Sequence, residues 1–152
     1  MQTVGVDSLN HTFEKTHIWL RELSEEAGLL SEAQAYSILR AVLQTLRDRL
    51  TIDECAHLAS HLPMLLRGVY YEGWKPARNP VKHRSVEEFL AAIADRLGNS
   101  AVDPEHGCRA VFRFLDSKIN RGELDDVRHM LPAEIRGLWG PSSSPPGAGR
   151  RF

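Results

Sequence analysis

The 152-residue sequence has few cysteines and no long apolar run, and each absence excludes a class of protein. Its two cysteines, Cys55 and Cys108, are far apart and form no Cys-x-x-Cys pair, so they are predicted to be buried or half-buried thiols and not a disulfide framework. Charged residues interrupt every apolar run within a few positions, so a membrane-spanning helix is not expected.

An excess of charge of either sign is also missing. Nineteen Lys and Arg residues face twenty Asp and Glu residues, so the whole chain lacks the positive charge that drives non-specific nucleic-acid binding. The first ten residues contain no basic side chain and no signal-peptide core, which favours a cytoplasmic location.

What is present is the composition of an ordinary globular domain. The sequence is 42% hydrophobic and 26% charged, which indicates neither disorder nor a fibrous class, and 152 residues suffice for one core without disulfides or metals. We therefore expect a single domain.

Apolar residues recur at steps of three and four along most of the chain, and no useful stretch alternates by two, so the fold is predicted to be all-α. Capping residues, prolines and glycines mark the predicted helix ends. The predicted helices span 13–28, 31–50, 51–62, 63–70, 85–98, 103–119, 120–131 and 132–139. Residues 1–12 are predicted to be a flexible N-terminus, 73–84 a linker and 140–152 a disordered tail.

An internal repeat is the strongest signal in the sequence. The segment 62–70, Leu-Pro-Met-Leu-Leu-Arg-Gly-Val-Tyr, matches 131–139, Leu-Pro-Ala-Glu-Ile-Arg-Gly-Leu-Trp, at an offset of 132 − 63 = 69 positions. The same offset relates the predicted helix caps Thr51 and Asn120. The sequence therefore predicts two tandem pseudo-equivalent four-helix units, 13–72 and 85–139, packed as one helical domain.

The two Leu-Pro-x-x-x-Arg elements, with Tyr70-Tyr71-Glu72-Gly73-Trp74 after the first, resemble a bacterial family known as domain of unknown function 2267. The resemblance extends from about Phe13 to Trp139. It implies a helical bacterial protein and supplies no activity.

Acidic and histidine side chains at helical spacing suggest a possible metal-binding site. Glu54, His57 and His61 fall at i, i+3 and i+7 of a predicted helix, a spacing related to the Glu-x-x-His pairs of di-metal bundles. Glu54 is already explained as part of a helix cap, and the repeat does not conserve the histidines, so we predict no metal and no cofactor. A metal-dependent helical-bundle enzyme using these residues is kept as an alternative.

Arg67 and Arg136 occupy equivalent places, four residues after a helix-starting proline. We expect each to pair with a carboxylate or with helix-end carbonyls inside the protein, because a half-buried guanidinium needs a fixed partner. The alternative is that both arginines bind an anion or an acidic partner segment.

Aromatic residues flank the basic linker. Tyr70, Tyr71 and Trp74 precede Lys75, Arg78, Lys82, His83 and Arg84, and Trp139 is the repeat counterpart of Tyr70. Such residues are enriched in recognition surfaces and could stack single-stranded nucleic acid. The alternative is that the aromatic rings pack beneath the linker.

No nucleophile-elbow motif and no glycine-rich phosphate loop is present. The sequence therefore favours a non-enzymatic protein-interaction or regulatory module with an unknown protein partner. Metal-dependent catalysis and nucleic-acid binding through the linker stay open as alternatives.

Overall fold

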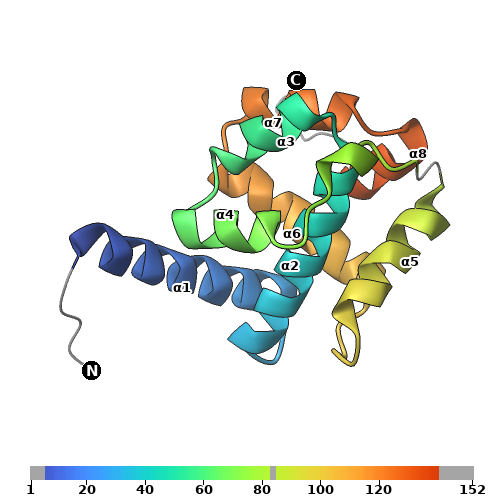
Figure 1. Ribbon diagram of the computed structural model, residues 1–152. Helices are drawn as coiled ribbons and strands as arrows, with labels where there is room; N and C mark the ends of the chain where they lie inside the picture. Colours follow the sequence, from blue (N-terminus) through green and yellow to red (C-terminus); the bar gives the residue numbers. More distant parts are fainter. Residues whose placement is uncertain (1–5, 83–84, 141–152) are drawn as a thin grey trace, which may run out of the picture.

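The computed structural model describes residues 6–82 and 85–140, and within these residues it contains α-helices and short 3-10 helices but no β-strand (Figure 1). The prediction of an all-α fold is confirmed. No helix in this part of the chain is long and apolar enough to cross a membrane. The elements in chain order are α1 Asp7–Ala27, α2 Glu32–Arg49, α3 Ile52–Ala59, α4 Met64–Tyr71, η1 Pro76–Arg78, α5 Val86–Leu97, α6 Pro104–Lys118, α7 Arg121–His129, α8 Ala133–Arg136 and η2 Gly137–Trp139.

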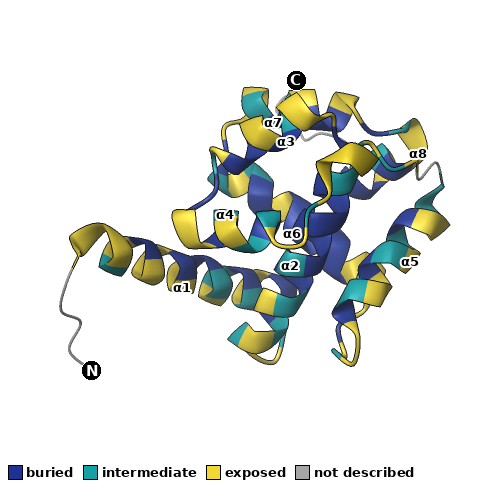
Figure 2. Cartoon of the chain, in the orientation of Figure 1, coloured by how far each residue is buried: buried dark blue, intermediate teal, exposed yellow. Residues whose placement is uncertain are grey.

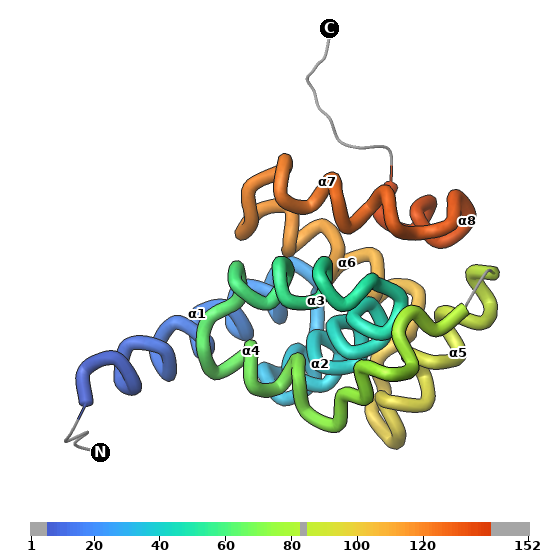
Figure 3. The backbone as a smooth tube through the Cα atoms, turned by 45° about the horizontal axis from the view of Figure 1, so that its top comes forward, coloured from blue at the N-terminus to red at the C-terminus, as the bar shows by residue number. Residues whose placement is uncertain are grey.

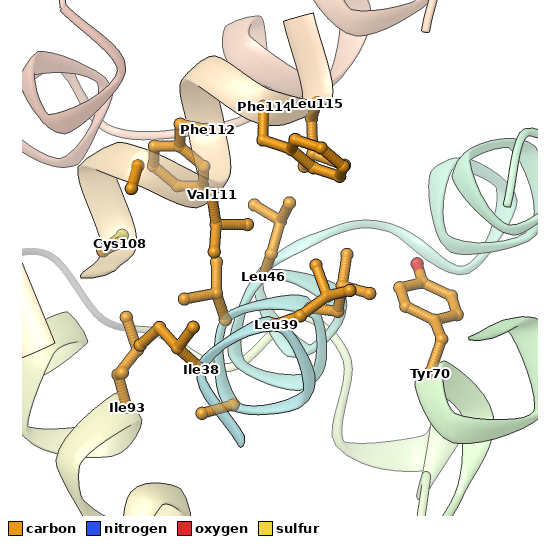
Figure 4. Close-up of a cluster of buried hydrophobic side chains, with 14 of the residues drawn as sticks. Ile38, Leu39, Leu46, Tyr70, Ile93, Cys108, Val111, Phe112, Phe114 and Leu115 are labelled. Carbon is orange, nitrogen blue, oxygen red and sulfur yellow. The ribbon is translucent and has the colours of Figure 1, made fainter. Parts of the chain in front are cut away.

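Helix α2 lies at the centre of the fold. It packs against α1, α4, α5 and α6, and every residue from Ala41 to Arg47 is buried (Figure 2). Apolar side chains from α2, α4, α5 and α6 interlock around it, among them Leu39, Tyr70, Ile93 and Phe112 (Figure 4). Both cysteines are buried and free, as predicted.

A glycine brings α6 close to α2. A Cβ atom at Gly107 would lie 2.5 Å from Cγ1 of Ile38 and 3.0 Å from Cγ1 of Val102, so no larger residue fits without a shift in the core. The cause is steric, because Gly107 is an ordinary helical position without a positive φ.

The predicted helix caps form. The side chains of Ser31, Thr51 and Asp103 accept hydrogen bonds from backbone amides in the first turns of α2, α3 and α6. Ser85 and Glu88 make a complete capping box at α5, and Gly28 ends α1 in the left-handed conformation. Each cap involves residues within one helical turn of each other, which is why the sequence alone located these helix ends.

Helix α1 begins at Asp7, ahead of the predicted start at Phe13, so residues 7–12 are helical in the structure where a flexible segment was expected. A long-range contact explains this extension. Thr12 is buried, and its Oγ1 accepts a hydrogen bond from the Leu65 amide at 3.1 Å, which satisfies a free amide in the first turn of α4. The N-terminal half of α1 projects away from the rest of the protein (Figure 3).

The linker is held against the C-terminal end of α2. The side-chain amide of Asn79 donates to the carbonyls of Arg47 and Leu50, both at 2.8 Å, and the amide of Val81 donates to the carbonyl of Asp48. Of the predicted linker, His83 and Arg84 lie outside the described residues, as does all of the predicted tail beyond Gly140.

Substituting Gly107→Ala is expected to destabilise the protein by about 1 to 3 kcal/mol, because the added methyl group overpacks the contact with Ile38. Urea unfolding followed by circular dichroism measures the change. Gly68→Ala is the matched control, since a Cβ at Gly68 in α4 meets nothing within 4 Å and alanine favours the helix by about 1 kcal/mol. Equal effects of the two substitutions would contradict the packing argument.

Candidate functional site

Arg67 and Arg136 make equivalent hydrogen bonds in the two halves of the chain. Arg67 donates to the carbonyl oxygens of Ala59 at 3.0 Å and Leu62 at 3.1 Å, at the C-terminal end of α3. Arg136 donates to the carbonyl oxygens of Arg128 at 3.2 Å and Leu131 at 2.8 Å, at the C-terminal end of α7. The carbonyls of Ala59 and Arg128 also accept a backbone amide, so each guanidinium adds a second donor there and bonds a further carbonyl beyond the helix end, an internal pairing of the kind expected for a structural arginine.

The aromatic residues that the sequence suggested for a recognition surface mostly face inward. Tyr70 is fully buried and its hydroxyl donates to the carbonyl of Cys55 at 3.0 Å. Burial raises the pKa of the Cys55 thiol to about 11, so this thiol stays protonated at neutral pH. Trp139 is buried as well, stacks on Phe112 with ring centroids 4.0 Å apart and donates to Asp116 at 3.0 Å.

Tyr71 and Trp74 are half-buried beside the linker. Their rings lie 5.4 Å apart, and the Trp74 indole donates to Asn79 at 2.8 Å. Lys75, Arg78 and Lys82 are exposed. The basic side chains of the linker are thus exposed to solvent. The indole N–H of Trp74 is hydrogen-bonded to a residue of the linker itself.

A histidine pair meets a carboxylate where α3 and α7 lie side by side. His57 lies on α3, His61 in the turn that follows it, and Glu123 in the first turn of α7. His57 Nε2 is 2.5 Å and His61 Nε2 is 3.5 Å from the same oxygen, Oε1 of Glu123. One potential ligand atom from each residue lies within 4.8 Å of the others.

The carboxylate of this group differs from the one considered at the sequence level. The sequence grouped Glu54 with the two histidines, whereas the structure brings Glu123 to them, at position 54 + 69 = 123. His61 also lies beyond Ala59, the last residue of α3, so the three sequence-predicted residues do not share one helix. The hydrogen bond from His57 lowers the pKa of the Glu123 carboxyl below its usual value, so Glu123 is ionised at neutral pH.

Glu14 with His17 and Asp126 with His129 repeat the acid–histidine spacing on α1 and α7, but among the described residues neither pair is part of a three-residue group. His17, three positions after Glu14, pairs across the helices with Glu32 of α2 at 2.7 Å. His129, three positions after Asp126, is exposed at the end of α7.

An apolar groove runs between α1, α2 and α4. It encloses a cavity of about 200 Å³ lined by Phe13, Thr16, His17, Leu20, Tyr36, Leu65, Leu66 and Val69. Phe13 is 58% exposed and Leu65 45% exposed, so both rims present large apolar side chains to solvent. Val6 and Leu9, which are 59% and 56% exposed, extend this apolar surface toward the N-terminal end of α1.

Sequence reasoning missed the groove and the role of Glu123. Phe13 shares the helical spacing of the buried residues Thr16 and Leu23, so spacing alone does not distinguish it from them, although it is 58% exposed at the rim of the groove. For Glu123 a signal did exist. If two related units pack through equivalent helices, the glutamate near the start of one helix faces the equivalent helix of the other unit. Adding the offset of 69 to position 54 gives Glu123 as that residue.

Arg67→Ala and Arg136→Ala are each expected to destabilise the protein by about 2 to 4 kcal/mol, because the helix-end carbonyls lose a charged donor. Chemical unfolding of both variants measures this effect. Arg113→Ala, at an exposed position of α6, is the control and should change stability by no more than about 0.5 kcal/mol. Unchanged unfolding midpoints for both variants would assign these arginines to a recognition surface.

Comparison with known proteins places the chain in a family. Residues 16–138 match the model of a family described as an uncharacterized conserved protein (DUF2267). No curated protein matches the chain. The matched segment covers most of the sequence, from the middle of α1 to η2, and includes both Leu-Pro-x-x-x-Arg elements. The chain therefore belongs to the DUF2267 family.

Proposed function

We propose that the chain is a non-enzymatic protein-interaction module whose binding surface is the apolar groove between α1, α2 and α4. The observation that carries this proposal is the gathering of exposed large apolar side chains at the groove, namely Phe13 and Leu65 on its rims, with exposed Leu9 one turn before Phe13 on α1. Contiguous apolar surface of this kind is uncommon on monomeric proteins and typical of interaction sites.

The shape of the groove favours a helix as its occupant. Leu9, Phe13 and Leu20 lie on one side of α1 at steps of four and seven, so the apolar strip extends for about 17 Å along the helix axis. An amphipathic helix with apolar residues at i, i+4 and i+11 matches a strip of this length and spacing.

We assign the groove to α1 of a second copy of the chain. The N-terminal half of α1 projects from the protein and carries an exposed apolar strip, so each copy offers both an apolar groove and an amphipathic helix to fill it (Figure 3). In a two-fold dimer the same surface of each copy forms the interface, so the apolar strips of both copies are buried together.

We further propose that the two halves of the chain are related four-helix units. The residues at each arginine support this relation, since Arg67, Ala59 and Leu62 become 136, 128 and 131 when 69 is added, and these are the residues that bond in the second half. The packing supports it too. The contacts of α1 with α2 and of α2 with α4 have counterparts in those of α5 with α6 and of α6 with η2.

The dimer is expected to dissociate when Phe13 is replaced by Glu. Burial of a phenylalanine from each copy is worth about 1.5 to 3 kcal/mol per side chain, so Phe13→Glu should weaken association at least about 100-fold. Sedimentation velocity over a concentration series measures the dissociation constant of the wild type and the variant.

Leu30→Glu is the control for this experiment, because Leu30 is 89% exposed and does not line the groove. It should dimerise as the wild type does. A wild-type protein that stays monomeric up to millimolar concentration, or a Phe13→Glu variant that dimerises equally well, would refute the assignment to a second copy.

A further inference from the structure

The group formed by His57, His61 and Glu123 has a donor set that suits a metal ion. Two imidazole nitrogens and one carboxylate oxygen are ligands that zinc commonly takes in proteins. The three side chains come from α3, the turn that follows it and α7, and His57 and Glu123 are 66 positions apart, so only the folded chain assembles the group. It involves no residue that lines the apolar groove.

The distances at the group are close to those of a bound ion. Zinc–ligand bonds of about 2.0 to 2.1 Å in tetrahedral geometry separate the ligand atoms by about 3.3 Å. His61 Nε2 already lies 3.5 Å from Glu123 Oε1, and His57 Nε2 lies 2.5 Å from it. A small outward rotation of the His57 ring is therefore enough to admit an ion between the three atoms.

A simple histidine–glutamate ion pair explains only part of this arrangement. His57 and Glu123 form such a pair, but Nε2 of His61 is buried and has no hydrogen-bond partner among the described residues. Leaving a buried polar atom unsatisfied is unfavourable, and a third ligand to a shared ion would satisfy it. The exposed pair of His17 and Glu32 shows the contrast, since it contains no third ligand.

We propose that His57, His61 and Glu123 bind one zinc ion that joins α3 to α7. The side chains are 42%, 30% and 40% exposed, so the ion has access from solvent and a fourth position open to water. Because α3 and α7 belong to opposite halves of the chain, the ion acts as a clamp between them.

The direct test is a zinc titration of the full chain, purified without a His tag and freed of metal with a chelator. Isothermal titration calorimetry should give one zinc per chain, with binding that weakens as the pH falls because protons compete for the ligand atoms. Zinc at about 100 times its dissociation constant should raise the melting temperature by about 5 to 10 °C.

His61→Ala is the decisive variant. His61 Nε2 makes no hydrogen bond among the described residues, and its contacts with Glu123 at 3.5 Å and with the His57 ring lie at a partly exposed site, so its removal should leave the metal-free protein folded with only a small change in melting temperature. It should weaken zinc binding at least about tenfold and abolish the thermal shift. Glu123→Gln should have the same effect on zinc binding, and circular dichroism verifies that both variants are folded.

His17→Ala is the matched control, because it removes a histidine from an exposed His–Glu pair that lacks a third ligand. It should bind zinc as the wild type does. Wild-type zinc binding no tighter than that of His61→Ala, or binding lost equally in His17→Ala, would overturn the proposal.

Discussion

The burial of α2 is the constraint on which the rest of the structure depends. Because its C-terminal half, from Ala41 to Arg47, is buried on all sides, the polar side chains there need partners, and most of these partners come from other elements. Gln44 donates to the carbonyl of Val69 in α4, and Thr45 accepts from Arg96 of α5. Arg47, only 3% exposed, donates to the carbonyls of Tyr70 and Glu72 at the end of α4. These hydrogen bonds hold α4 and α5 at defined positions along α2, in addition to the apolar packing between the helices.

The sequence predicted what depends on neighbours along the chain. Caps such as Ser85 with Glu88, and the arginines four residues after Pro63 and Pro132, act within one turn or one helix end, and their patterns are visible in the residues themselves. It did not predict that Thr12 supports α4 or that Glu123, and not Glu54, meets the histidines. Both depend on how distant helices pack, and spacing along one helix carries no information on that.

The same packing explains where the candidate surfaces lie. Helix α4 has eight residues and packs against only part of α1, whose 21 residues reach beyond it, so Leu9 stays exposed while Phe13 and Leu65 line the groove between the two helices. Helices α3 and α7 meet at the edge of the core with exposed polar side chains, and there the histidines and Glu123 come together. The proposed interaction surface and the proposed zinc site thus occupy places that the core leaves unfilled.

Both halves of the chain contribute to one core around α2 and α6, and native-state hydrogen exchange measures whether this core unfolds as a single unit. The buried amides of α2 and α6 are expected to exchange only through global unfolding, with the same free energy, while residues 7–12 of α1 exchange at much lower free energy. Exchange of α2 and α6 at clearly different free energies, with one half opening while the other stays protected, would contradict it.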